Sequence, residues 1–450
     1  MNNRTNTKRY DTVIIGAGIA GLVCARALIE AGKSVLILEA RDRLGGRILT
    51  ARDAGFSFPI ELGAEFIHGA PKVTFERLEA AGLTFYDLTD KHLRRPDAKA
   101  SQAKTQTKTP KLVPLDYFEK IQNLFAKLDE NRKTDRTVEQ FLSAQKSLDP
   151  TIEKMARSYV EGFHAADPNL IGERALAQAQ KSGDDLNGSE SFRVLEGYDR
   201  LIAYLAQGTA ARLNTIVKKI SWKKSDVSIE CLSAGEFELP AIKAKTVVVT
   251  IPLGVLKGPS KSKAAVEFDP VPKGYETALQ GLEMGHAMRI NFRFRSRFWD
   301  IGREEPIGFL HAGPEKDFPT WWSMMPLRTP ILTAWQGGPK VEALSQLSDA
   351  ERVQTALTTL AYILDMKLED VQAQLDTWYF HDWSKDPYSL GAYSFVGVNG
   401  DERAKRLAEP FENTLFFAGE ATHTSAERGT VDGAIDTGER AAKQVLKALS

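Results

Sequence analysis

Three glycines near the N-terminus carry the clearest chemical signal in the chain. Gly16, Gly18 and Gly21 form the pattern G-x-G-x-x-G within YDTVIIGAGIAGL. In dinucleotide-binding proteins the first glycine permits a tight turn, the second lets the backbone approach a pyrophosphate, and the third allows close packing of helix on strand. Glu39 follows eighteen residues after Gly21, where a carboxylate can accept hydrogen bonds from a ribose diol. The spacing predicts a dinucleotide site that disfavours a 2′-phosphate.

A second glycine-rich turn follows directly, in the stretch RDRLGGR. It places Arg41, Arg47 and two glycines where a pyrophosphate would lie. Proteins that bind NAD do not need such a turn, so it favours FAD; a solvated charged turn is the alternative for this segment alone.

The C-terminal part of the chain supports FAD as well. In LFFAGEATHTSAERGTVDGA a buried strand is expected to end at Gly419 and Glu420, and a helix to begin at Thr430. The N-terminus of such a helix can stabilise the negative charge of a reduced isoalloxazine ring.

These segments require a strand–helix–strand unit at the start of the chain. Residues 11–15 and 34–39 have the apolar pattern of buried strands, and residues 19–31 between them have the pattern of a helix. The β-branched run KTVVVTI at 245–251 and LFFA at 415–418 predict further buried strands.

The rest of the chain has a different pattern. Residues 115–179 are mostly helical, whereas strands are expected at 287–294, 307–311, 320–324 and 331–336, and a helix at 348–364. Residues 94–114 are rich in Lys, Thr and Gln and are expected to form a solvated loop.

The predicted fold class is therefore α/β. A Rossmann-like FAD-binding domain is interleaved with an α+β substrate domain made of an antiparallel sheet and helices. The predicted FAD-binding domain comprises residues 9–75, 191–275 and 397–450, and the predicted substrate domain comprises residues 76–190 and 276–396.

Composition excludes several classes of protein. The 450 residues contain 59 basic and 59 acidic side chains, so charge gives no reason to expect nucleic acid as a partner. Cys24 and Cys231 are too few for a disulfide framework. No signal peptide, membrane span, membrane anchor or metal-ligand spacing is found. We expect a soluble cytoplasmic protein without a metal.

At this point the sequence resembles a known family. The motifs IIGAGIAGL, LEARDRLGGR, ELGAEFIHG, VLEGYDRL, TVVVTIPLGVLK, HDWSKDPYSLGAY and FAGEATHTSAERGTVDGA occur in the order found in flavin amine oxidases. That superfamily contains monoamine oxidases, polyamine oxidases and flavin-type histone demethylases. The resemblance spans nearly the whole chain, although the central helical part matches only loosely. It implies an FAD domain and a substrate domain whose sheet roofs the flavin.

The resemblance implies a set of cofactor-binding positions. The three glycines would line the pyrophosphate, and Glu39 would bind the adenosine ribose. Arg41 and Arg47 would lie near the phosphates, and residues 63–65 would pass the flavin. The backbone of one valine would meet the adenine, and the C-terminal segment would surround the ribityl chain and the pyrimidine edge of the flavin. These positions are Gly16, Gly18, Gly21, Glu39, Arg41, Arg47, Gly63, Ala64, Glu65, Val217, Glu420, Thr430 and Val431.

The resemblance also implies amine chemistry. Enzymes of the family remove a hydride equivalent from the carbon next to an amine nitrogen, the imine hydrolyses, and oxygen reoxidises the flavin to give hydrogen peroxide. Tyr393 matches an aromatic wall of the amine site, and an aromatic face suits an amine or its cation. The opposite wall, a tyrosine in monoamine oxidases, is Thr430 here. A cage with one wall favours a polyamine or another secondary amine over a monoamine.

Two histidines are candidates for the amine site. His68 matches a position that is His in some polyamine oxidases and Glu in others, so it could orient a secondary amine; a purely structural histidine is the alternative. His311 could also line the site. Three tryptophans on predicted strands are expected in the core rather than at the substrate: Trp321, Trp322 and Trp335.

Two further positions depart from family patterns. Covalent members attach the flavin through a cysteine just before the aromatic-wall tyrosine, and Ala392 stands there, so non-covalent FAD is expected. Most members carry a lysine that holds a water against the flavin, and Arg289 falls at that position if the register counted from Phe298 and Trp299 is right. Otherwise Arg289 would point to solvent or to a surface acid.

Three other functions stay open from sequence alone. One is a flavin dehydrogenase or desaturase that acts on an apolar substrate such as a carotenoid or a porphyrin precursor. Another is an L-amino-acid oxidase, although those enzymes carry an arginine motif where this chain has GAEFIHG. The third is an FAD-stabilised binding protein without turnover.

Overall fold

The N-terminal segment folds as the strand–helix–strand unit that its apolar pattern predicts. The computed structural model describes residues 8–89, 91–95, 112–115, 117–185, 190–425 and 427–450. Strand β1 (Arg9–Ile15) leads through the glycine turn into α1 (Ile19–Glu30) and then into β2 (Val35–Leu38), which pairs in parallel with β1. Every residue of β2 is buried, as expected for a strand covered on both faces.

The sheet around β1 gathers segments from distant parts of the chain. Its strand order is β10-β2-β1-β13-β12-β11-β14, and β22 pairs with β13. The pairs β1–β13 and β13–β22 are parallel, whereas β11, β12 and β13 form an antiparallel meander. Besides β1 and β2, the strands in this order are β10 (Ala211–Arg212), β11 (Thr215–Lys223), β12 (Asp226–Ser233), β13 (Glu238–Val249), β14 (Glu267–Asp269) and β22 (Leu415–Phe417).

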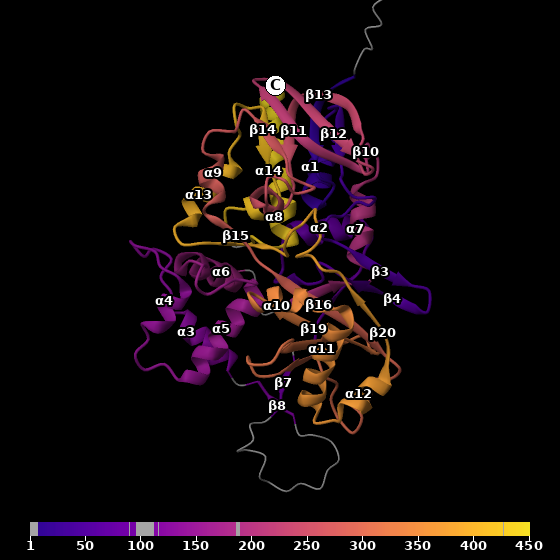
Figure 1. Ribbon diagram of the computed structural model, residues 1–450, viewed down its shortest axis with the longest axis vertical. Helices are drawn as coiled ribbons and strands as arrows, with labels where there is room; N and C mark the ends of the chain where they lie inside the picture. Colours follow the sequence, from indigo (N-terminus) through magenta and orange to yellow (C-terminus); the bar gives the residue numbers. More distant parts are fainter. Residues whose placement is uncertain (1–7, 90, 96–111, 116, 186–189, 426) are drawn as a thin grey trace, which may run out of the picture.

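Three helices share one core with this sheet. Buried residues of α1, α7 (Tyr198–Leu205) and α14 (Val431–Leu449) form a single apolar cluster with β2 and β22. Figure 1 shows this part of the molecule at the upper end, where the C-terminal helix α14 lies beside the N-terminal strand and helix.

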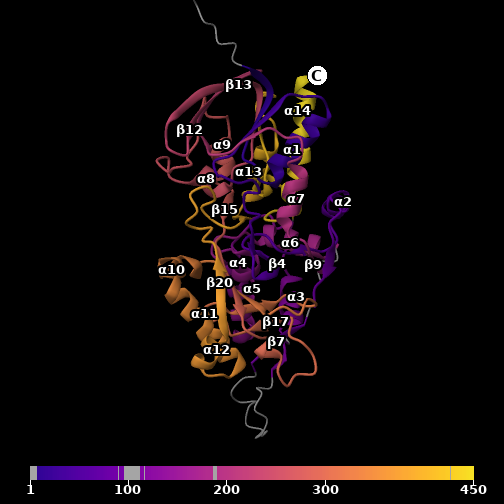
Figure 2. The same ribbon diagram turned by 90° about the vertical axis from the view of Figure 1, so that its right-hand side faces the viewer.

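A seven-stranded sheet lies at the opposite end of the molecule (Figures 1 and 2). Its order is β20-β16-β19-β18-β17-β7-β8, and most of its pairs are antiparallel. Its strands are β7 (His92–Arg94), β8 (Val113–Pro114), β16 (Ala287–Phe294), β17 (Phe309–His311), β18 (Thr320–Ser323), β19 (Ile331–Gly337) and β20 (Leu375–Phe380).

The two faces of this lower sheet have different neighbours. Met288, Ile290 and Phe292 of β16 join a core shared with the helices α10 (Lys340–Gln346), α11 (Asp349–Leu364) and α12 (Leu368–Gln374). Because side chains alternate along a strand, Ala287 and Arg289 take the other face, where they line a cavity.

Four helices pack around a separate apolar core at the side of the lower sheet (Figure 1). They are α3 (Phe118–Phe125), α4 (Val138–Ser143), α5 (Pro150–His164) and α6 (Glu173–Asp185). Helix α5 begins at the N-cap Asp149, which accepts from the backbone of Thr151 at 2.7 Å, and ends where Ala165 adopts a left-handed conformation. The indole of Trp335 donates to the carbonyl of Gly162 at 2.8 Å, so β19 fixes the end of α5.

Short elements connect these parts. They are β3 (Thr50–Asp53), β4 (Phe56–Glu61), β5 (Ile67–His68), α2 (Lys72–Ala80), β6 (Phe85–Asp87), β9 (Ser191–Val194), α8 (Leu253–Lys257), α9 (Tyr275–Leu279), β15 (Leu282–Met284), η1 (Phe298–Asp300), β21 (Ser394–Val396), α13 (Gly400–Ala408) and η2 (Glu420–Thr422).

Some predicted elements need correction. The segment 94–114 is not wholly a loop, because both of its ends pair as β7 and β8; residues 96–111 lie outside the described part of the chain. Within the motif VLEGYDRL, Gly197 is the N-cap of the helix α7. Among the described residues, no helix has both the length and the apolar character needed to cross a bilayer.

Candidate active site

A cavity of about 850 Å³ opens between the two ends of the molecule. Residues from both sheets and from α3, α5 and α6 line it. Fifteen of the sixteen predicted site residues lie on its surface. They are Gly16, Gly18, Glu39, Arg41, Arg47, Gly63, Ala64, Glu65, His68, Val217, Arg289, Tyr393, Glu420, Thr430 and Val431.

The remaining predicted residue, Gly21, lies beneath the cavity floor. A Cβ atom there would come within 2.2 Å of the carbonyl oxygen of Gly16, so only glycine lets α1 pack this closely on the turn. Gly18 caps α1, and a Cβ atom on Gly18 would meet no other atom within 4 Å. The N-terminus of α1 therefore faces open space, which suits a phosphate.

The second glycine turn packs directly against the first. The amide of Gly45 donates to the carbonyl of Ala17 at 2.9 Å, and Gly45 forms a parallel bridge with Gly18. Gly46 has a φ of +59°, and a Cβ atom there would lie 3.2 Å from the Cα of Gly18. The RDRLGGR stretch is therefore a close-packed turn and not a solvated one.

Glu39 joins these two turns. Its side chain is buried and accepts from the backbone amides of Ala17 at 2.8 Å and Arg41 at 2.9 Å. The carboxylate thus orients both turns and still lines the cavity at the end of β2, where a ribose diol could reach it.

The guanidinium of Arg41 is held by the HDWSKDPYSLGAY segment. Its Nη2 donates to Asp386 at 2.8 Å and to the hydroxyl of Ser389 at 2.9 Å. Asp386 also pairs with His381 at 2.9 Å. Burial alone would raise the pKa of Asp386, but the His381 hydrogen bond and the charge of Arg41 bring it to about 2. This ionised acid holds Arg41 in place on the wall of the cavity.

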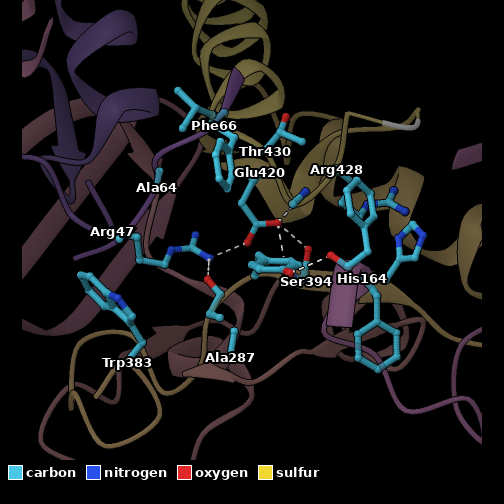
Figure 3. Close-up of a pocket in the computed structure, with 18 of the residues that line it drawn as sticks. Arg47, Ala64, Phe66, His164, Ala287, Trp383, Ser394, Glu420, Arg428 and Thr430 are labelled. Atoms are coloured by element: carbon cyan, nitrogen blue, oxygen red, sulfur yellow. Dashed lines mark hydrogen bonds and ion pairs between the residues drawn. The ribbon is translucent and has the colours of Figure 1, made fainter. Parts of the chain in front are cut away.

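A second ion pair connects the RDRLGGR turn to the C-terminal segment (Figure 3). Arg47 donates to Glu420 at 2.8 Å and to the carbonyl of Ala392 at 2.7 Å. The other oxygen of Glu420 accepts from Ser394 at 2.6 Å and from the amide of Gly429 at 3.1 Å. Since all its oxygens have donors, Glu420 fixes the strand β21 and the loop before α14.

The N-terminus of α14 provides a second helix end at the cavity. Thr430 caps it by accepting from the amide of Gly433 at 3.0 Å, and both Thr430 and Val431 line the cavity. Figure 3 shows Thr430 above Glu420, between Phe66 and Arg428. The two helix N-termini and two arginines provide positive potential along the cavity, as an anionic dinucleotide and a reduced flavin require.

Aromatic side chains line the far part of the cavity. Tyr393 reaches across it and donates its hydroxyl to the carbonyl of Phe163 on α5 at 2.8 Å. The ring of Phe163 lies edge-on to His68, with 5.3 Å between centroids. Phe163 is 48% exposed although it lines this cavity, so its ring is available to a ligand.

His68 is placed close to Tyr393 and Phe163 rather than in the core. Its Nδ1 lies 3.2 Å from the hydroxyl of Ser191, and among the described residues Nε2 has no hydrogen-bond partner. Burial lowers the pKa of His68 to about 4, so the ring is neutral near pH 7. A neutral imidazole can accept a hydrogen bond from an amine N–H.

A pair of histidines marks the other end of this aromatic region. Nδ1 of His92 lies 2.8 Å from Nε2 of His311, so one of the two rings must donate to the other. Phe309 stacks on His92 at 4.3 Å. His311 lines the cavity, in agreement with the sequence-based suggestion.

The tryptophan prediction is only partly right. Trp321 is fully buried in the core of the lower sheet, as expected. Trp322 and Trp335 line the cavity instead, because they sit on the opposite face of their strands from the core residues. The indole of Trp322 donates to Glu65 at 3.1 Å.

Arg289 is buried and faces the cavity, not the solvent. Its guanidinium donates to the carbonyl of Gly63 at 2.8 Å, to Glu65 at 2.6 Å and to the side chain of Asn291 at 3.1 Å. The register counted on β16 therefore places Arg289 against the segment 63–65. With most of its donors engaged, Arg289 is poorly suited to bind a substrate carboxylate.

Several residues of this site escaped the sequence analysis. Phe163 lies in the helical part that matches the family loosely, and Asp386 and Ser389 were part of a quoted motif without an assigned role. Arg193 pairs with Glu65 from β9 at 2.7 Å, a contact that no local pattern indicates. Arg193 and His92 could not be assigned to the site from sequence, because only their contacts with distant segments show that they belong to it.

Comparison with known proteins supports this geometry. Residues 19–446 match the family model described as flavin containing amine oxidoreductase. Polyamine oxidase 2 of Arabidopsis thaliana is 29% identical over 98% of this chain and 89% of its own length. Lysine-specific histone demethylase 2 of Homo sapiens is 26% identical over 96% of this chain, which spans 53% of that protein.

The fold is shared with solved structures. A putrescine oxidase bound to putrescine superposes with a TM-score of 0.79, at 20% identity, over 98% of this chain and 100% of that one. Cyclohexylamine oxidase from Brevibacterium oxydans gives a TM-score of 0.78 at 19% identity, over 98% and 100% of the two chains. The α/β architecture is thereby confirmed, and the family match confirms the predicted flavin cofactor. The chain belongs to the flavin-containing amine oxidoreductase family and is an FAD-dependent enzyme that oxidises amines.

Proposed function

We propose that this enzyme oxidises a polyamine or another secondary amine, with oxygen as the electron acceptor. The observation that carries the proposal is that one cavity joins the dinucleotide cradle to the aromatic region around Tyr393 and His68. The relatives named above include a polyamine oxidase and a putrescine oxidase, which supports this substrate class.

The residues divide into a cradle and an amine site. The cradle comprises the glycines at 16, 18 and 21, Glu39, Arg41, Arg47, the 63–65 segment, Val217, Glu420 and the start of α14. When FAD is bound it supplies the acceptor for the hydride equivalent of the amine. Ala392 cannot form a covalent link, so we propose that these residues hold FAD non-covalently.

The protein's own contribution to the reaction is orientation. The ring of Tyr393 offers a face to the amine, and its hydroxyl is fixed on the carbonyl of Phe163. The neutral His68 can accept a hydrogen bond from the amine N–H, which directs the nitrogen lone pair. Phe163 supplies a second exposed ring, which compensates for Thr430 at the position of the missing aromatic wall.

Arg289 would slow the oxygen step. A lysine can lose its proton when buried, whereas an arginine stays charged. Arg289 is also held by Gly63 and Glu65, so it can neither accept a proton from a water nor move freely. We therefore expect slow reoxidation of the flavin by oxygen and a tendency toward dehydrogenase behaviour.

We also propose a domain organisation and a cellular compartment for the enzyme. The cradle would belong to an FAD-binding domain of residues 9–75, 191–275 and 397–450, and the aromatic region to a substrate domain of residues 76–190 and 276–396. The two free cysteines, Cys24 and Cys231, are both buried, which suits a reducing compartment such as the cytoplasm.

The experiment that tests the function measures peroxide production with spermine, spermidine, their acetylated forms and benzylamine. Anaerobic bleaching of the bound flavin by the same amines detects turnover even if oxygen reacts slowly. Tyr393→Ala should raise KM far more than Tyr393→Phe, which keeps the ring. If only benzylamine-like compounds react, the polyamine preference is wrong; if no amine bleaches the flavin, the enzymatic proposal for these substrates is wrong.

A further inference from the structure

Three buried charged side chains form a connected group beside the cavity. Glu65 accepts from Arg289 at 2.6 Å through one carboxylate oxygen, and its other oxygen lies 2.7 Å from the Nε of Arg193. All three side chains are only 5–8% exposed. We call this group the Arg193–Glu65–Arg289 triad.

The triad carries an unbalanced positive charge. Burial alone would raise the pKa of Glu65, but the charges of Arg193 and Arg289 lower it, so the carboxylate stays ionised. Two guanidinium groups and one carboxylate leave the triad with a net charge of about +1 in a region of low dielectric constant. Burial raises the pKa of the neighbouring Glu61 to about 7, so below neutral pH this acid is mostly protonated and does not cancel that charge. Such a charge acts over a longer range there than on a solvated surface.

The triad has an inner and an outer end relative to the cavity. Arg289 and Glu65 line the large cavity, whereas Arg193 lines a neighbouring space of about 20 Å³ together with Glu61 and Asn291. The Nε of Arg289 is a buried donor without a hydrogen-bond partner among the described residues. The Nε and one Nη of Arg193 likewise lack hydrogen-bond partners there, so both guanidinium groups keep charge that hydrogen bonds do not fully satisfy, and Arg289 is the one of the two that lines the large cavity.

Geometry fixes the position of this charge. Arg289 binds Glu65 and the carbonyl of Gly63 at the same time through the two Nη atoms of its planar guanidinium. The ring of Trp322 lies 5.7 Å from the guanidinium and its indole N–H also donates to Glu65. Loss of Glu65 or of Arg193 would alter the net charge while the strand β16 still presents Arg289 to the cavity.

We propose that Glu65 sets the net charge that the protein presents to the flavin, and that Glu65 and Arg193 are positioning residues that act through Arg289. The proposal rests on the proposed course of the flavin beside residues 63–65. A positive charge favours the electron-rich, anionic state of the ring, so the triad makes bound FAD easier to reduce. Glu65 limits this effect by cancelling one of the two arginine charges.

The test uses the holoenzyme and needs no amine substrate. The midpoint potential of the flavin and the dissociation constant for sulfite, which binds electron-poor flavins, are measured for the wild type and for single variants. Glu65→Gln keeps the shape and adds one net positive charge, so it should raise the potential and tighten sulfite binding about tenfold. Arg289→Met should lower the potential and weaken sulfite binding by a similar factor.

A matched control exists elsewhere in the chain. Glu173 is also a buried acid paired with two arginines, with its oxygen 2.5 Å from Arg136 and 3.5 Å from Arg132, although these arginines are partly exposed. Glu173→Gln should leave both flavin measurements unchanged. Thermal unfolding of each variant shows whether the substitution has destabilised the fold. A change in potential is attributed to the altered charge only where the variant unfolds at the same temperature as the wild type.

Two outcomes would overturn the proposal. One is a folded Glu65→Gln holoenzyme whose potential and sulfite affinity are unchanged or shifted in the opposite direction. If Glu65→Gln fails to fold, Arg193→Gln decides, because loss of the outer charge should weaken sulfite binding and an unchanged value refutes the proposal. A wild type that retains FAD and binds sulfite but oxidises no amine would count against the proposed function and leave this test intact.

Discussion

Replacing Glu39 with alanine removes the acceptor that holds two turns of the cofactor cradle together. The backbone amides of Ala17 and Arg41, 2.8 and 2.9 Å from its carboxylate oxygens, would lose their partners. Each buried backbone hydrogen bond contributes about 1 kcal/mol net, so the apoprotein should lose roughly 1–3 kcal/mol of unfolding free energy. Loss of the charge-assisted bonds to the ribose should cost a further 1–3 kcal/mol, about 10- to 100-fold in FAD affinity.

Two measurements separate these effects. Titration of apoprotein with FAD, followed by quenching of flavin fluorescence, gives the dissociation constant, and urea unfolding of the apoprotein gives its stability. Glu39→Gln keeps one acceptor oxygen and should fall between wild type and alanine. Glu30→Ala, at an exposed position of the neighbouring helix α1, is the control and should match the wild type. A folded Glu39→Ala protein with wild-type FAD affinity would refute the assigned role.

Other predictions concern the flavin, the oxygen step and the support of the cradle. Because Ala392 lacks a nucleophile, acid precipitation should release all yellow colour into the supernatant; colour in the pellet would contradict non-covalent binding. Arg289→Lys should speed reoxidation of reduced flavin in stopped-flow experiments, and a wild type that is as fast or faster would disprove the proposed limitation. Asp386→Asn should lower the unfolding free energy by about 1–2 kcal/mol near neutral pH. The folded-state pKa of Asp386, about 2, lies below its usual 3.8, so its contribution is present above pH 3.8 and lost as the pH falls toward 2. A wild-type to variant difference that persists at pH 2 would argue against this linkage.

Short sequence patterns were sufficient to predict those elements of the fold whose structure depends on residues close together in the chain. The strand–helix–strand unit follows from apolar runs and from glycines whose backbone conformations exclude other residues. Arg289 was assigned to the family's lysine position by counting back from Phe298 and Trp299, and the structure places it on the cavity face of β16. Most positions predicted by resemblance to a family to hold the cofactor lie around one cavity, because many of them sit at or near the end of a strand or helix.

The features of the site that the sequence did not predict depend on contacts between segments that are distant in the chain. Glu65 was predicted to pass the flavin, but nothing in its neighbours along the chain indicates Arg193 or Trp322 as partners. Trp322 was assigned to the core because it lies on a predicted strand; it is buried as expected, but it also lines the cavity and its indole N–H donates to Glu65. Phe163 lies at the site because the side chains of Trp335 and Tyr393 donate to backbone carbonyls at the C-terminal end of α5 and fix its position.

The cofactor cradle joins the turn at Gly16 to the helix that begins at Val431, with β22 paired beside β13. During synthesis on the ribosome, the first of these parts emerges long before the second. The edge of β13 stays uncovered until residues 415–417 arrive, and the second helix end is missing until α14 forms. FAD can therefore bind in full only after nearly the whole chain has been translated. Loading of the cofactor becomes a late step of biogenesis, and truncation before residue 415 should yield a protein that cannot retain FAD.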